Sequence, residues 1–186
     1  WISGFFGSGK SHFLKILSYL LENREVTHEG QTRKAAEFFR SKITDAMLVA
    51  DIERAVSSDT DVLLFNIDSK ADAADGRDTV LRVFLKVFNE KLGYCGDHAH
   101  IAHMERMLSA KGVYDRFRAI FEADAGESWE AARDAYSFHL DAFGKALSEA
   151  LGQAIPDAEA WMQRFETDFS LTVENFAEWI RDYLDK

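Results

Sequence analysis

The feature that most restricts this chain is a glycine-rich segment near its start, Gly-Phe-Phe-Gly-Ser-Gly-Lys-Ser at residues 4–11. It matches the pattern G-x-x-x-x-G-K-[ST], in which backbone amides surround phosphate oxygens, the lysine ammonium reaches the β- and γ-phosphates, and the last hydroxyl binds Mg²⁺. We therefore expect ATP and Mg²⁺ as ligands. The residues expected to contact them are Gly4, Phe5, Phe6, Gly7, Ser8, Gly9, Lys10, Ser11 and His12, with Lys10 as the catalytic residue and Ser11 as the magnesium ligand.

The segments around the motif favour a strand–loop–helix arrangement. Residues 1–3 read as the end of a buried strand, and residues 10–22 have the three- and four-residue apolar spacing of an amphipathic helix. The short apolar run at 61–68 is typical of a second strand covered on both faces. These features predict an α/β fold with a P-loop NTPase core.

The remaining residues predict a mostly helical chain. Residues 23–34 read as a polar loop, and 35–56 as a helix with a break near Ser41 or Thr44. A helix is expected over 78–92, followed by helices near 98–110, 112–124, 128–151, 156–167 and 172–185. Pro156 suits a first helical turn and Thr172 suits an N-cap. We expect two parts, an α/β nucleotide-binding part at 1–95 and a helical region at 96–186.

Charge and composition exclude some classes of function. The formal net charge of −10 disfavours broad, non-specific binding to a polyanion. No apolar run is long enough for a transmembrane helix, so no membrane association is expected. The single Cys95 cannot form an intrachain disulfide, which fits a cytoplasmic setting. It is expected to be a small core residue.

Hydrolysis of ATP needs further groups. Asp68, which ends the second expected strand, is a candidate magnesium partner, but Ser69 follows it where an Asp-Glu pair would have Glu. We expect the acidic pair beyond Lys186. An arginine from a neighbouring protomer is expected to complete the site, and no spacing favours one candidate. These candidates are Arg77, Arg82, Arg106 and Arg116.

Two other groups have alternative interpretations. His98, His100 and His103 lie close in sequence and predict either a metal site or the capping and surface contacts of a helix start. A set of aromatic residues predicts either core packing or a face that docks a partner. The set consists of Trp161, Phe165, Phe169, Phe176 and Trp179.

Several segments together resemble a known family. They are Gly-Phe-Phe-Gly-Ser-Gly-Lys-Ser-His-Phe at 4–13, Leu-Ser-Tyr-Leu-Leu-Glu-Asn at 17–23, Asn-Ile-Asp-Ser-Lys-Ala-Asp at 66–72, Phe-Leu-Lys-Val-Phe-Asn-Glu at 84–90 and Leu-Thr-Val-Glu-Asn-Phe at 171–176. The chain resembles the P-loop ATPase family of the bacteriophage-exclusion (BREX) systems, called BrxC or PglY. Its members are far longer, so the resemblance implies that this chain is a slice of such a protein.

The resemblance also implies a function. It implies a cytoplasmic ATPase of the AAA+ and origin-recognition-like group, acting beside a DNA methyltransferase and other BREX components in phage defence. A homo-oligomer is possible, as is indirect contact with DNA. Two other functions share the loop: a P-loop small-molecule kinase, which would need an arginine-rich lid, and a scaffold that binds ATP without hydrolysing it.

Overall fold

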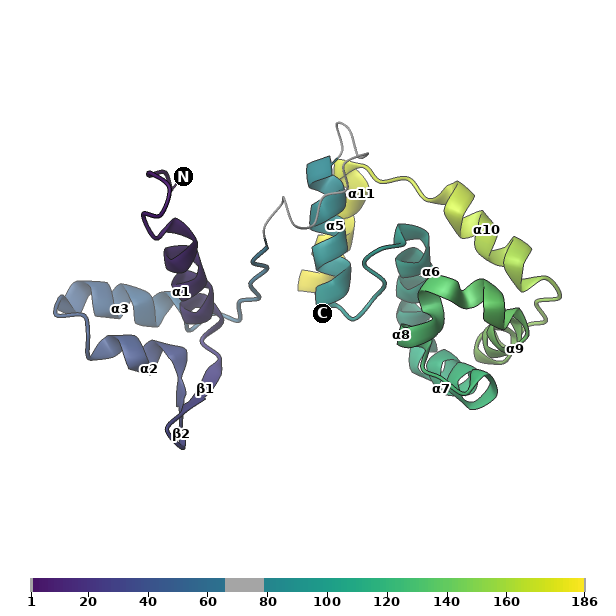
Figure 1. The fold of residues 1–186 in the computed structure, drawn as a ribbon, viewed down its shortest axis with the longest axis horizontal. Helices are drawn as coiled ribbons and strands as arrows, with labels where there is room; N and C mark the ends of the chain where they lie inside the picture. Colours follow the sequence, from purple (N-terminus) through teal and green to yellow (C-terminus); the bar gives the residue numbers. More distant parts are fainter. Residues whose placement is uncertain (1, 66–78, 186) are drawn as a thin grey trace. The chain divides into compact units, whose positions relative to one another are not determined.

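The computed structural model describes residues 2–65 and 79–185, and the chain divides into two compact units, Trp1–Asn66 and Ile67–Lys186. Figure 1 shows their elements. The division lies earlier in the chain than the expected boundary between residues 95 and 96, because the helix over Thr79–Lys91 belongs to the second unit.

The described residues of the first unit form helices and a hairpin, which Figure 1 labels. Its elements are α1 (Lys10–Glu22), β1 (Glu25–His28), β2 (Gln31–Lys34), α2 (Ala35–Arg40) and α3 (Ala46–Ala55). The break between α2 and α3 confirms the interruption expected near Ser41 or Thr44. Asp45 caps α3 by accepting hydrogen bonds from the amides of Met47 and Leu48.

The hairpin replaces the loop expected at 23–34. β1 and β2 pair antiparallel, with Glu25 opposite Lys34 and His28 opposite Gln31. Glu29 and Gly30 connect them with φ of 51° and 74°. Positive φ at both central residues is the backbone of a two-residue hairpin turn, and glycine adopts it without steric cost.

The predicted α/β fold with a P-loop NTPase core is wrong. In the described ranges, the only sheet is this two-stranded hairpin, and neither residues 2–3 nor 61–65 form a strand. A strand buried on both faces needs helices above and below it. Ile2 is 46% exposed and Leu64 is 50% exposed, so nothing covers these segments as a core sheet would be covered.

The described residues of the second unit form helices joined by short connections, with no strand among them. It contains α5 (Thr79–Lys91), α6 (Ala99–Ala110), α7 (Tyr114–Ala125), α8 (Trp129–Ala132), the 3₁₀ helix η2 (Arg133–His139), α9 (Leu140–Leu151), α10 (Ala158–Asp168) and α11 (Val173–Leu184). These elements confirm the helices expected in this half. The single helix expected at 128–151 is instead three elements, with non-helical angles at Ala135.

The structure confirms one of the two predicted helix starts and contradicts the other. The hydroxyl of Thr172 accepts a hydrogen bond from the amide of Asn175 at 3.1 Å, so the predicted N-cap of α11 is confirmed. Pro156 does not occupy a first helical turn, because α10 begins at Ala158. Asp157 caps that helix instead, by accepting from the amide of Ala160 at 2.8 Å. A carboxylate at the N-cap satisfies an otherwise unpaired amide.

The core of the second unit centres on Trp129. Its ring stacks on Phe143 with centroids 5.6 Å apart and meets Phe117 and Phe121 edge-on at 5.0 and 5.2 Å. All four side chains are fully buried. Offset and edge-to-face contacts stabilise aromatic pairs beyond the area that they bury. This cluster holds α7, α8 and α9 together.

None of the helices in the described ranges has both the length and the apolar composition that a membrane crossing requires.

Candidate functional site

The candidate phosphate loop lies immediately before α1. The amide of Ser8 donates to the carbonyl of Phe5 at 3.2 Å, which closes a turn inside the loop. Gly7 and Gly9 have φ of 78° and 82°. L-residues with a side chain rarely adopt this region, so the backbone at residues 7 and 9 favours glycine. Gly9 is a fixed glycine of the pattern, whereas Gly7 stands at one of its variable positions.

The N-terminus of α1 is open to an anion. Gly9 is the N-cap, no side chain caps the first turn, and that turn contains no acidic residue. The first amides of a helix lack partners within the helix and lie at the positive end of its dipole. Together with the preceding loop they provide donors suited to phosphate oxygens.

Lys10 folds its side chain back over the loop. Its ammonium donates to the carbonyl oxygens of Gly4 and Phe5 at 2.8 and 2.7 Å and to the hydroxyl of Ser8 at 3.3 Å. Three acceptors match the three donors of an ammonium group. The motif residues predicted from sequence are therefore brought together, with the positive charge over the loop rather than turned away from it.

The other motif side chains face solvent. Phe5 and Phe6 are 92% and 107% exposed, and the side chains of Ser11 and His12 are also exposed. Ser11 follows Lys10 in the first turn of α1, where its hydroxyl can reach a cation bound beside the loop. The loop is thus accessible to a ligand as large as a nucleotide.

No protein-family model matches this chain, and no solved structure matches it.

The partners expected for hydrolysis are not assembled in the described part of the chain. Asp68 and Arg77 lie outside the described residues. Among the residues that are described, no three His, Cys, Asp or Glu side chains form a group that could hold a metal ion. Arg82 and Arg116 are exposed, whereas Arg106 is partly buried.

The three histidines do not form the alternative metal site in the described structure. His98 is the N-cap residue of α6, and its ring lies 5.8 Å from that of His100. The ring of His103 instead packs against Phe165, Phe169 and Trp179. Burial lowers the pKa of His103, and the neighbouring charge of Arg106 lowers it further. His103 is therefore part of an aromatic contact.

Cys95 is a core residue, as expected. It is buried, its thiol donates to Asp134 at 3.4 Å, and its sulfur accepts from the amide of His98. Burial, with a smaller contribution from Asp134, raises the thiol pKa to about 11. A thiol that stays protonated at neutral pH is a poor nucleophile.

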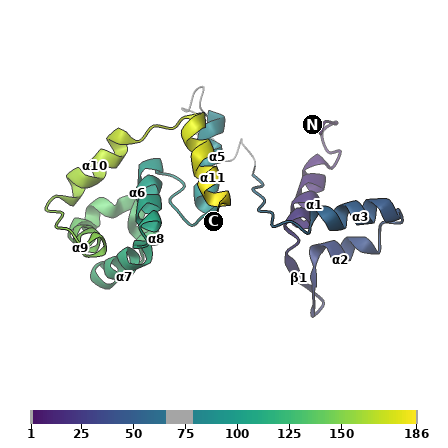
Figure 2. The ribbon, with the colours of Figure 1, turned by 180° about the vertical axis from the view of Figure 1, so that it is seen from behind.

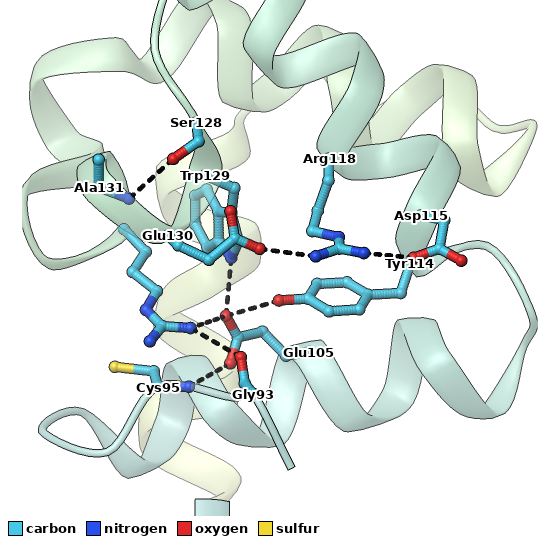
Figure 3. A network of polar contacts seen from close by, with 11 residues as sticks. Gly93, Cys95, Glu105, Tyr114, Asp115, Arg118, Ser128, Trp129, Glu130 and Ala131 are labelled. Atoms are coloured by element: carbon cyan, nitrogen blue, oxygen red, sulfur yellow. Dashed lines mark hydrogen bonds and ion pairs between the residues drawn. The ribbon is translucent and has the colours of Figure 1, made fainter. Parts of the chain in front are cut away.

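Sequence reasoning missed a buried polar network around Glu105, shown in Figure 3. The Glu105 carboxylate is fully buried and accepts hydrogen bonds from the Cys95 amide, the Tyr114 hydroxyl and the Trp129 indole at 2.6, 3.0 and 2.7 Å. Arg133 adds a charged donor at 3.2 Å. With four donors around it, Glu105 links the helices of this unit and has a structural role.

The predicted aromatic set is mostly half-buried rather than core. Phe176 is buried, whereas Trp161, Phe165, Phe169 and Trp179 keep intermediate exposure. Trp161 and Phe165 contact each other, and Phe169 stacks on Trp179. Phe165, Phe169 and Trp179 pack against His103 of α6, and Trp179 also covers the guanidinium of Arg106.

Proposed function

We propose that residues 4–11 bind the triphosphate of ATP together with Mg²⁺. The observation that carries this proposal is the position of the Lys10 ammonium over a loop with two left-handed glycines, at a helix start that no side chain caps. Amide donors, a helix dipole and one cation on a short loop suit an anion with several oxygens.

Binding of ATP replaces the hydrogen-bond acceptors of the Lys10 ammonium. Without a ligand, its ammonium is held by two neutral carbonyls and a hydroxyl. A phosphate oxygen carries negative charge, and charge-assisted hydrogen bonds are about twice as strong as neutral ones. The ammonium therefore moves to the β- and γ-phosphates, while the amides of the loop and the first turn of α1 hold the remaining oxygens. Ser11 offers its hydroxyl to the cation.

We further propose that the chain is the ATP-binding part of an ATP-hydrolysing subunit in a BREX defence complex in the cytoplasm. This step is supported by the sequence segments that resemble the BREX P-loop ATPases, including residues 4–13. It places the chain beside a DNA methyltransferase and other components of that system, with DNA contacted indirectly. The groups that activate water then come from outside the described residues.

A scaffold that binds ATP without hydrolysing it is the second candidate. The observation in its favour is that, among the described residues, no three His, Cys, Asp or Glu side chains form a group that could hold a metal ion. Hydrolysis needs an acid that holds Mg²⁺ and orients water. Measured turnover in the intact complex separates the two functions, because the scaffold retains ATP and releases no phosphate.

The proposal is tested by calorimetric titration of the chain with ATP and Mg²⁺. Lys10→Ala is expected to weaken ATP binding at least about tenfold, since it removes a charged donor to the phosphates. Lys15→Ala is the matched control, because Lys15 is exposed on the same helix and its loss changes the net charge equally. Equal ATP affinity in the two variants, or equal affinity of the parent chain for AMP and ATP, would refute a triphosphate site.

A further inference from the structure

Arg106 of α6 presents an unusual set of unpaired donors. Its Nη1 donates to the amide oxygen of Asn89, and its guanidinium lies 4.2 Å from the ring centroid of Trp179. Its Nε and Nη2 are shielded from solvent and have no hydrogen-bond partner among the described residues. Burial lowers the pKa of Arg106 to about 10, so the group remains charged at neutral pH.

The two unpaired atoms are the pair that binds planar anions. Nε and Nη2 lie on the same edge of the guanidinium plane, and their N–H groups are parallel. This edge matches the two oxygens of a carboxylate, which it binds with two parallel hydrogen bonds. Buried charged donors without an acceptor are costly. A carboxylate at this edge would supply the two acceptor oxygens that the Nε and Nη2 donors lack.

The Arg106 side chain lines a cavity that is large enough for such an acceptor. It has a volume of about 410 Å³ and lies between side chains of α5, α6 and α11. A cavity of this size is typical of sites for small organic molecules. Its lining includes Phe88, Tyr94, His103, Arg106, Trp179 and Asp182. Aromatic walls around one guanidinium suit a ligand with an apolar body and a single negative charge.

Helix α11 forms one wall of the cavity, and side chains hold it in place. Phe88 of α5 meets the rings of Phe176 and Tyr183 edge-on at 5.7 and 5.8 Å, and α11 runs beside α5 in Figures 1 and 2. Only Phe176 of α11 is buried. Trp179 covers the Arg106 guanidinium, and Nε and Nη2 are shielded from solvent, so a ligand at these two atoms requires the indole to shift.

We propose that this cavity binds a small organic carboxylate, with its two oxygens on Nε and Nη2 of Arg106 and its apolar body against Phe88 and Trp179. The site is distinct from the phosphate loop, because every residue of it belongs to the second unit. Asp182 adds a negative charge to the wall and disfavours ligands with more than one negative charge.

Phenylacetate is a suitable probe, and phenylacetamide is its neutral counterpart of nearly the same shape. Titration of the full chain, followed by NMR, is expected to give phenylacetate an affinity at least about tenfold higher than that of phenylacetamide. Inorganic phosphate, which lacks an apolar body, is expected to bind beside Trp179 at least about tenfold more weakly than phenylacetate. Binding is judged from the indole signal of Trp179, so that phosphate held by residues 4–11 does not contribute. Absence of phenylacetate binding at Trp179, or phosphate or amide binding there equal to it, overturns the proposal.

Variants test the role of the guanidinium edge. Arg106→Lys keeps the charge, removes the edge and is expected to lower phenylacetate affinity at least about tenfold. Arg116→Lys on exposed α7 surface is the matched control, and Lys10→Ala is a second control; both are expected to leave that affinity unchanged. Unchanged binding in folded Arg106→Lys contradicts the proposal.

If that variant does not fold, Asp182→Asn tests the site instead. It removes a charge that repels the carboxylate and is expected to bind phenylacetate several-fold more tightly than the parent chain. Equal or weaker phenylacetate binding by Asp182→Asn counts against the site.

Discussion

The indole N–H of Trp129 donates a 2.7 Å hydrogen bond to Glu105, and both side chains are fully buried. Trp129 lies in α8 and Glu105 in α6, so the bond joins elements that are distant in sequence. The same indole stacks on Phe143 in the aromatic cluster. The Trp129 side chain thus fills part of the core, and its indole N–H offsets part of the free-energy cost of burying the Glu105 carboxylate.

Replacement of Glu105 by Gln is expected to destabilise the chain by about 2–4 kcal/mol. The substitution keeps the shape of the side chain but removes the charge, and its new NH₂ group faces donors instead of acceptors. Urea denaturation followed by circular dichroism measures the loss. Glu122→Gln is the control, because Glu122 is exposed on α7 and its change is expected to cost little. Equal stability of the two variants would show that the Glu105 network contributes nothing.

Alkaline pH is expected to destabilise the second unit from about pH 9 upwards. The pKa of the Cys95 thiol is raised from 9.0 to about 11, chiefly by burial, so the folded chain keeps a proton that the unfolded chain releases. Stability is then fully present below pH 9 and falls as the pH rises to about 11. The loss over this window is about 3 kcal/mol. The measurement is urea denaturation at a series of pH values.

The Tyr114 hydroxyl adds to this loss at higher pH. Burial raises its pKa above the ordinary 10.0, and the nearby charge of Glu105 raises it further. Cys95→Ala is therefore expected to flatten the profile between pH 9 and 10 and to leave a decline above pH 10. A profile for Cys95→Ala that matches the parent chain at every pH would exclude the thiol as the cause.

The sequence predicted those parts of the fold that depend on local pattern. The helices of the second unit follow from apolar spacing, and the cap at Thr172 follows from a hydroxyl that precedes such a segment. The hairpin was missed because Val26 is the only strongly apolar residue among polar neighbours in its strands, so no alternating pattern is visible. The sheet was expected from short apolar runs alone, whereas a sheet needs covering layers that sequence spacing does not reveal.

The candidate sites also separate into those that a local sequence pattern predicts and those that depend on contacts between distant residues. The phosphate loop was predictable because its pattern is local in sequence, with Gly9 in the left-handed region directly before the helix that Lys10 begins. Glu105 and Arg106 could not be predicted, since adjacent charged residues in a helix usually face solvent. Their burial depends on Trp129 and Trp179, which are far away in sequence and approach only in the folded unit.

Loss of the Thr172 cap is expected to loosen α11 locally. Thr172→Ala removes the acceptor of the Asn175 amide and is expected to cost about 1 kcal/mol of helix stability. Hydrogen exchange of the α11 amides measures the effect, which is expected to be faster exchange there than in α7. Thr172→Ser keeps the hydroxyl and should restore protection. Thr167→Ala is a further control, because that hydroxyl bonds a carbonyl inside α10.

Gly9 and Gly30 provide a matched test of the phosphate loop. Both have left-handed backbones, with φ of 82° and 74°, and a Cβ added to either would meet no atom within 4 Å. An alanine at either position therefore adds about 1 kcal/mol of backbone strain without a clash. Gly9 lies in the loop proposed to hold phosphate, whereas Gly30 lies in the hairpin turn.

Gly9→Ala is expected to weaken ATP binding, because relief of the strain rotates the amides away from the phosphate oxygens. Gly30→Ala is expected to lower stability by a similar amount and to leave ATP affinity unchanged. Denaturation and calorimetric titration of both variants measure the two quantities separately. If both alanines reduced ATP affinity equally, the effect would come from general destabilisation of the first unit. ATP affinity would then not depend on the backbone geometry of the loop.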